Sequence, residues 1–313
     1  MTNIVTLLIQ QVLIMFLLAA VGYICFRTKK ITMEGSRNIG NILIYLSLPC
    51  VIINSFLVEF SKERLIGLLY SSLAAAVVLF ISILVSRLVF KKDPICHFAS
   101  SFSNPGFFGI PLIVATLSDG AVFYVATFIA MVNLLQWTYG VALLTKKEGK
   151  AAGNQILPLL KRLFTAPFMI AILIGLFFFF TRLPMPSLIG KGIQYISGLN
   201  TPLAMFTIGI YLAQTNLGKM LCKPKLYLLA GVRLLVIPIL SLLVLWVLPA
   251  EYGEMKMALL IVSACPVGSN VAVYAQLHNS DYSYAVETVV ISTLLSIVSI
   301  PLIVQIAGML NFY

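Results

Sequence analysis

Uncharged, apolar residues fill most of the chain, and charged residues are gathered into short stretches between them. Crossing a hydrocarbon core takes roughly 20 apolar residues in a helix. Ten segments of about this length are present: residues 1–26, 38–58, 65–86, 94–118, 120–145, 163–181, 192–218, 226–250, 257–280 and 282–313. Arg233 and Glu287 alone interrupt the eighth and tenth segments. The pattern predicts an all-α polytopic membrane protein with ten transmembrane helices.

The charges support this class and orient the chain. Only 10% of the 313 residues are charged, against about 25% in soluble domains, which excludes a soluble enzyme and a disordered protein. Most of the 21 Lys and Arg residues lie in the loops after the first, third, fifth and seventh segments. Basic loops stay cytoplasmic, so we expect both termini outside. Basic cytoplasmic loops beside anionic lipid then explain the net charge of +11. No charge pattern indicates nucleic-acid binding.

A long polar stretch divides the ten segments five and five. We treat residues 146–162 as a cytoplasmic linker between two five-helix repeats, 1–145 and 163–313. Because five is odd, two related halves must lie in opposite orientations. Pro49 in helix two and Pro202 in helix seven occupy matching places, and helices four and nine also resemble each other. Inverted repeats of this kind indicate a secondary transporter.

Helices four and nine carry residues that break a helix near its middle. The residues are Asn104, Pro105 and Gly106 in helix four, and Pro266, Gly268, Ser269 and Asn270 in helix nine. Proline lacks an N–H donor and glycine eases unwinding, so we expect both helices to open at mid-depth. Either break alone fits a packing kink, whereas two at matching positions favour a substrate site. The N-terminus of a half-helix suits a carboxylate.

Ionisable and amide side chains inside the segments give further candidates. Glu287 lies about 9 Å into helix ten, and Arg233 about as deep in helix eight. They either pair, or Glu287 takes up a coupling proton, or both anchor at the headgroups. His97 either titrates near neutral pH or caps a helix end. Asn133 on helix five either faces the crossing or makes an interhelical hydrogen bond.

Several strings together resemble the auxin efflux carrier family over essentially the whole chain. They are the sequence Asn-Pro-Gly-Phe-Phe-Gly-Ile-Pro-Leu at 104–112, Pro266-x-Gly268 followed by Ala272 and Tyr274, Pro202-Leu-Ala ending in Gly209, and Ser-Thr-Leu-Leu-Ser at 292–296 before Pro301. The chain is similar to bacterial members related to the plant PIN-type auxin carriers. In the plant carriers a proline precedes the asparagine, whereas here Pro105 follows it.

The resemblance implies an elevator-type carrier in the plasma membrane. Helices 1, 2, 6 and 7 would form a scaffold domain, and helices 3–5 and 8–10 a transport domain. Broken helices four and nine would cross at the substrate site, with Asn104 as the substrate asparagine and Pro266 and Gly268 at the crossover. A homodimer through the scaffold helices is also implied.

The leading hypothesis is a secondary active transporter of small organic anions, such as mono- or dicarboxylates or an indole acid, with a proton or sodium as the coupling ion. A sodium-coupled symporter of the bile-acid type is the alternative, and its ligand candidates are hydroxyls: Ser100, Ser101, Ser292 and Thr293. Protease, hydrolase and Walker motifs are absent, and no spacing indicates a metal or cofactor site, so we do not expect an enzyme. A membrane receptor is less favoured because no loop is long enough for a signalling domain.

Overall fold

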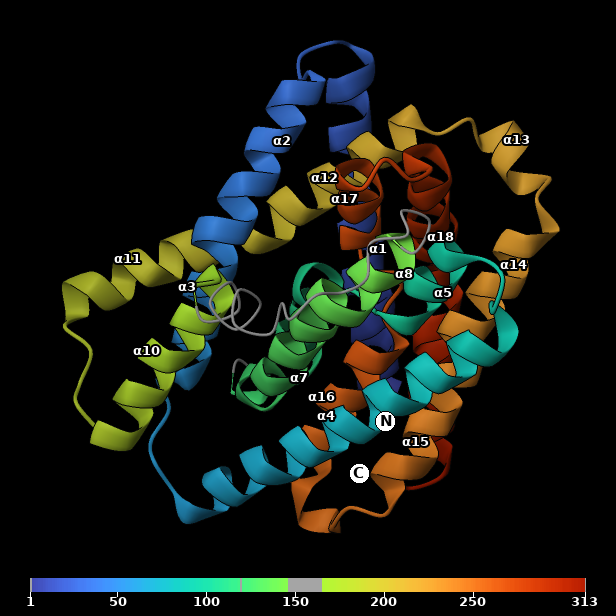
Figure 1. Cartoon of the computed structure of the whole chain (residues 1–313). Helices are drawn as coiled ribbons and strands as arrows, with labels where there is room; N and C mark the ends of the chain where they lie inside the picture. Colours follow the sequence, from blue (N-terminus) through green and yellow to red (C-terminus); the bar gives the residue numbers. More distant parts are fainter. Residues whose placement is uncertain (1, 119, 146–164, 313) are drawn as a thin grey trace.

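The computed structural model describes residues 2–118, 120–145 and 165–312 and is helical in these ranges, with one isolated β-bridge (Figure 1). Seven helices of this described part are long and apolar enough to cross a membrane. They are Ile4–Arg27, Met33–Phe56, Lys62–Val89, Ala121–Thr145, Ser187–Gln214, Pro224–Trp246 and Tyr282–Met309. The polytopic helical class is therefore confirmed. The expected linker, 146–162, lies outside the described residues.

The three remaining predicted segments do not form single long helices. The segment 94–118 is split into α5 (Pro94–Ser101) and α6 (Ile110–Thr116). The segment 257–280 is split into α16 (Gly253–Ala264) and α17 (Asn270–Leu277). The breaks predicted in helices four and nine are thus present. The segment 163–181 contains α10 (Pro167–Thr181), which is shorter than a typical span.

Three of the long spans are single helices, and the other four are built from consecutive helices. Their bounds are α1 (Thr2–Arg27), α2 (Met33–Ile42), α3 (Leu48–Phe56), α4 (Lys62–Val89), α7 (Ala121–Leu135), α8 (Val141–Thr145), α11 (Ser187–Ser197), α12 (Asn200–Gln214), α14 (Pro224–Gly231), α15 (Ile237–Trp246) and α18 (Tyr282–Met309). Two short helices connect spans, α13 (Leu217–Leu221) and the 3₁₀ turn η6 (Ala250–Tyr252). Side chains cap several of the helix starts: Ser61 accepts from the Arg64 amide at α4, and Asp281 from the Tyr284 amide at α18.

The described chain contains four wide π-helical turns, of which three lie within a long span and the fourth begins the half-helix that follows Asn104. Their bounds are η1 (Leu43–Ser47), η2 (Pro105–Gly109), η3 (Gln136–Gly140) and η5 (Val232–Val236). Three of them end two residues before a proline, namely Pro49, Pro111 and Pro238. Proline removes an amide donor and clashes with the carbonyl one turn earlier, and a wider turn relieves that clash without ending the helix.

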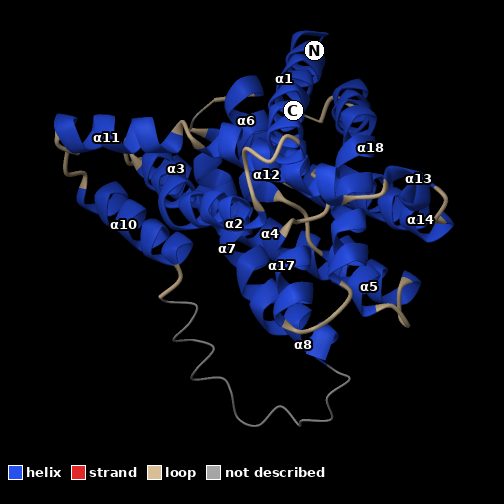
Figure 2. Cartoon of the chain, turned by 90° about the horizontal axis from the view of Figure 1, so that it is seen from above, coloured by secondary structure: helices blue, strands red, loops and turns tan. Residues whose placement is uncertain are grey.

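The helices form two groups that lie side by side. In both views α3, α10 and α11 lie at one end of the molecule, and α5, α13 and α14 at the other (Figures 1 and 2). Helices α1 and α12 pack against each other between them. Gly209 permits this close approach, because a Cβ atom there would overlap the backbone carbonyl of Ala19.

Large apolar side chains remain exposed along the long helices. They include Leu17, Phe80, Leu88 and Val298. An aqueous surface would disfavour so many of them, whereas a hydrocarbon layer would not. The exposed apolar surface agrees with the length and composition of the seven spans.

The two broken helices cross through a short antiparallel β-bridge between Ser103 and Val267. The Asn104 amide donates to the Pro266 carbonyl at 2.9 Å, and the Gly268 amide donates to the Phe102 carbonyl at 3.0 Å. Backbone groups that leave a helix within a membrane need such partners. The crossing supplies them from the other broken helix.

We predict that Gly268→Ala destabilises the fold. A Cβ atom at Gly268 would lie 2.9 Å from the Ser103 backbone oxygen and 3.2 Å from Nε2 of Gln136. Overpacking against backbone costs about 1–3 kcal/mol, which would lower the thermal unfolding midpoint of detergent-purified protein. Gly231→Ala is the matched control, because a Cβ there meets nothing within 4 Å. Equal midpoints for the two variants would contradict the tight crossing.

Candidate functional site

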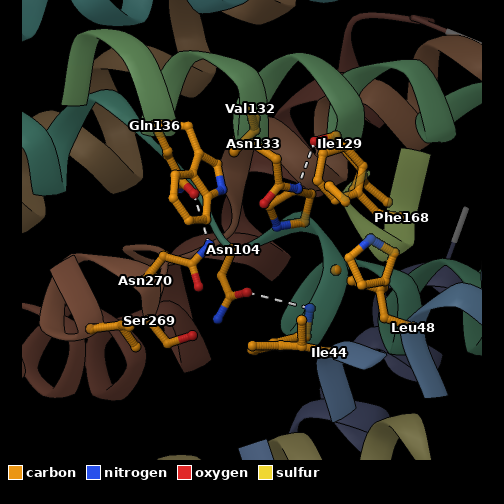
Figure 3. Close-up of a pocket in the computed structure, with 18 of the residues that line it drawn as sticks. Ile44, Leu48, Asn104, Ile129, Val132, Asn133, Gln136, Phe168, Ser269 and Asn270 are labelled. Carbon is orange, nitrogen blue, oxygen red and sulfur yellow. Dashed lines mark hydrogen bonds between the residues drawn. The ribbon is translucent and has the colours of Figure 1, made fainter. Parts of the chain in front are cut away.

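A cavity of about 610 Å³ lies beside the crossing. Residues 103–106 and 268–270 of the crossing form part of its wall, together with α7, η3 and α17 (Figure 3). The opposite wall comes from η1, the first residue of α3 and the start of α10. Its volume is in the range of small-molecule sites. Among the residues described, none of those lining it carries a charge.

Seven of the eight predicted substrate residues line this cavity. They are Asn104, Pro105, Gly106, Asn133, Gly268, Ser269 and Asn270. Pro266 is the exception, and its carbonyl instead accepts the hydrogen bond from the Asn104 amide. The structure therefore brings together residues from three segments far apart in the sequence. Their role in substrate binding stays a prediction.

Local hydrogen bonds orient the two asparagine side chains of the first repeat. Oδ1 of Asn104 accepts from the Phe107 amide at 3.3 Å, which leaves its Nδ2 available as a donor. Nδ2 of Asn133 donates to the Ile129 carbonyl at 2.8 Å, which leaves its Oδ1 available as an acceptor (Figure 3). The Asn133 bond lies within its own helix. Asn133 lines the cavity, and its side chain forms no interhelical hydrogen bond with the described residues.

Gln136 and Ser103 also belong to the cavity wall, although we did not predict them as site residues. Nδ2 of Asn270 donates to Oε1 of Gln136 at 2.8 Å, so Nε2 of Gln136 and Oδ1 of Asn270 remain for a ligand. The Ser103 hydroxyl is buried and has no hydrogen-bond partner among the described residues. The spacing of Gln136 three residues after Asn133, on one helix face, was the available signal.

Aromatic rings border the polar part of the cavity. Trp137 and Tyr274 both line it, and their ring centroids are 5.4 Å apart in an edge-to-face arrangement. Phe107 and Phe168 line it as well. The cavity can thus contact an apolar carbon skeleton while amides hold polar atoms.

The predicted pair between Glu287 and Arg233 is wrong. Glu287 pairs with Nζ of Lys223 at 2.6 Å, because the loop before α14 places that lysine beside the second turn of α18. Arg233 points to the crossing and donates to Ser82, to the Ser100 carbonyl and to the Ser263 carbonyl. Neither Glu287 nor Arg233 lines the cavity.

His97 lies outside the cavity lining and is buried on α5. Its Nε2 is 3.1 Å from the Tyr139 hydroxyl on η3, and the two rings meet edge to face. The hydroxyl candidates for sodium have partners of their own. Ser100 and Ser101 donate to carbonyls one turn earlier in α5, and Thr293 does the same in α18. Ser292 accepts from the Val267 amide at 3.0 Å and so supports the crossing.

Asp93 ties the start of α5 to α14. Its Oδ1 accepts from the Cys96 amide at 2.9 Å, and its Oδ2 lies 2.5 Å from Nζ of Lys225. Burial by itself raises the pKa of Asp93, but the hydrogen bonds from Lys225 and Cys96 outweigh it and leave the pKa below its usual 3.8. The carboxylate is therefore ionised in the folded protein at neutral pH.

Comparison with known proteins gives the class of the molecule. A family model described as "Membrane transport protein" matches residues 7–304. The chain belongs to this family of membrane transport proteins. The resemblance to the auxin efflux carriers is thereby confirmed, and the molecule is a transporter and not an enzyme. The transporter is 22% identical over 300 residues to a protein of Rhizobium meliloti (strain 1021) named "Putative malonate transporter", with 92% of each chain covered.

We predict that Asp93→Asn lowers stability at neutral pH by ~1 kcal/mol, because it removes the ion pair with the exposed Lys225. The pKa of Asp93 is lower in the folded than in the unfolded chain. The stabilisation is thus present above about pH 4 and is lost as the pH falls through the folded pKa. Unfolding midpoints of both proteins should therefore converge in acid.

Asp281→Asn is a matched control, since Asp281 also caps a helix but has no ion pair among the described residues. Asp281→Asn should therefore lower the unfolding midpoint at neutral pH less than Asp93→Asn does. An Asp93→Asn difference that is the same in acid and at neutral pH would contradict the lowered pKa.

Proposed function

We propose that the chain is a secondary active transporter of small organic anions that binds its substrate in the cavity at the crossing. The observation that carries this proposal is a cavity at two broken helices lined by neutral amide, hydroxyl and aromatic groups. A crossing of broken helices is where secondary transporters hold their substrates. The relative named for malonate supports a carboxylate as the cargo.

The donors of the cavity suit a carboxylate. Nδ2 of Asn104, Nε2 of Gln136 and the hydroxyl of Ser103 have no hydrogen-bond partner among the described residues, and all three residues line the cavity. The half-helix that starts after Asn104 directs the positive end of its dipole toward the same region. Oδ1 of Asn133 and Oδ1 of Asn270 would accept hydrogen bonds from a protonated group at the other end of the substrate. A singly charged acid with a second protonated group fits this arrangement.

We further propose ten spans in two inverted five-helix repeats, 1–145 and 163–313, that work by an elevator mechanism. Scaffold helices would be 1, 2, 6 and 7, and their elements contact each other: α1 with α12, and α3 with α10 and α11. The elements of the transport helices also contact each other: α4 with α5, α7 and α15, and α16 with α7 and α18. The cavity takes its walls from both groups. A homodimer would form through the scaffold.

The proposed setting is the cell membrane, with both termini outside. The N and C marks lie near each other in both views, which agrees with an even number of crossings (Figures 1 and 2). Transport would be driven by an ion gradient or by exchange. One proposed coupling step is the uptake of a proton by Glu287, whose carboxylate pairs with Lys223 in this structure.

We predict that Asn104→Ala weakens uptake of the cognate anion. Losing one donor to a carboxylate costs about 1.5–3 kcal/mol, so the apparent KM should rise about tenfold or more. The assay is uptake of labelled malonate, malate, succinate and indole-3-acetate into proteoliposomes under imposed proton or sodium gradients. Asn38→Ala is the control, because Asn38 is exposed on α2 and outside the cavity. Saturable uptake that is unchanged in Asn104→Ala would place the substrate elsewhere.

If malonate is transported, we predict that its singly protonated form is the species carried. The cavity lining described here has no cationic side chain to neutralise two carboxylates. Initial rates measured at several pH values should therefore superimpose when plotted against the concentration of hydrogen malonate. Rates that follow total malonate instead would show that the dianion binds.

A further inference from the structure

Arg233 is the most buried large cation of the described chain. It lies on η5 with 2% of its surface exposed. The two ion pairs that the described residues form are Lys223 with Glu287 and Lys225 with Asp93, so no carboxylate neutralises Arg233. A buried charge without a partner is very costly. Its neutral contacts must therefore compensate for the lost water.

Those contacts are the last turns of α5 and α16, at the breaks, and one hydroxyl on α4. One guanidinium nitrogen donates to the Ser100 carbonyl at 3.1 Å and to the Ser82 hydroxyl at 3.2 Å, and the other donates to the Ser263 carbonyl. Ser100 lies in the last turn of α5, and Ser263 in the last turn of α16. Carbonyls in a last turn have no partner within the helix and form the negative end of its dipole. Arg233 thus joins two negative helix ends.

A sodium ion bound here would use the same kinds of ligand. Sodium prefers carbonyl and hydroxyl oxygens, and in secondary transporters half-helix C-termini coordinate the coupling cation. We propose that Arg233 is the built-in cation of the crossing: it takes the place of a coupling sodium between the ends of α5 and α16, and anion binding therefore requires no sodium. The uptake part of this inference rests on the proposed function, whereas the stability part does not.

The fixed cation also explains how a neutral cavity can hold an anion. Ser100 and Asn104 belong to one broken segment, and Ser263 and Gly268 to the other, so Arg233 and the cavity share the crossing. In a medium of low dielectric constant, the field of a buried charge extends beyond the groups that it contacts. One positive charge then matches one negative charge on the substrate. Arg233 acts as a positioning residue for the crossing and does not touch the substrate.

The first test is thermal unfolding of detergent-purified protein without substrate. The wild-type midpoint should be the same in sodium chloride as in choline chloride. Arg233→Ala should lower the midpoint, and low-millimolar methylguanidinium should restore part of the loss because it refills the site. Lys256→Ala is the matched control, since Lys256 is also buried but contacts the Leu248 carbonyl and the Phe312 ring. Methylguanidinium should not raise its midpoint.

The second test is anion uptake by Arg233→Lys and Arg233→Gln in proteoliposomes. Lysine keeps the charge, and glutamine keeps donors without charge. We expect wild-type uptake to be equal with and without sodium, Arg233→Lys to retain part of it, and Arg233→Gln to raise KM at least about tenfold. A purely structural role would affect both variants through the amount of folded protein and leave KM unchanged.

Three results would overturn the proposal. They are wild-type uptake or stability that requires sodium, an Arg233→Gln protein with wild-type KM, and an Arg233→Ala midpoint that methylguanidinium leaves unchanged. If Arg233→Ala does not fold, the wild-type unfolding midpoints in sodium chloride and in choline chloride still test whether the protein needs sodium. If no organic anion is transported by the wild type, the proposed function fails while the unfolding test still judges the role of Arg233.

Discussion

The backbone at the crossing has to be satisfied without water, and the rest of the structure depends on how this is done. Two helices stop in the interior, and each stop leaves amides and carbonyls without helical partners. The bridge between Ser103 and Val267 pairs the backbone groups where the two helices cross. Arg233 binds two carbonyls in the last turns of α5 and α16, those of Ser100 and Ser263. The groups of the crossing that line the cavity remain available to a ligand. Binding and folding therefore draw on the same set of backbone atoms.

In this arrangement the residues that would contact the substrate are neutral, and the positive charge belongs to a residue outside the lining. The cavity lining supplies shape, aromatic surface and oriented amides, whereas the positive charge is on Arg233, which is buried and is not part of the lining. A lining without ions costs little to desolvate each time the cavity empties. A carrier must release its cargo as readily as it binds it. Modest affinity suits that cycle better than a direct ion pair would.

Sequence reasoning located the site better than it located the charges. Proline and glycine act on their own backbone, so Pro105, Gly106 and Gly268 revealed the breaks directly. The partner of Glu287 could not be read in this way, because Lys223 reaches it from a loop 64 positions away. Gln136 was missed as a site residue for the same kind of reason. Its Oε1 accepts from Nδ2 of Asn270 in the other repeat, a contact that appears only once the chain is folded.

The π-helical turns carry a consequence for the shape of the helices. Each one adds a residue to its turn, so side chains before and after it no longer follow a single 3.6-residue stripe. Span Ala121–Thr145 can therefore direct Asn133 and Gln136 at the cavity and still present a different surface after Gly140. Deleting a single residue within η3 would restore the regular pitch and rotate α8 relative to α7. The turn thus changes the helical phase between α7 and α8, so the two ends of the span can pack against different neighbours.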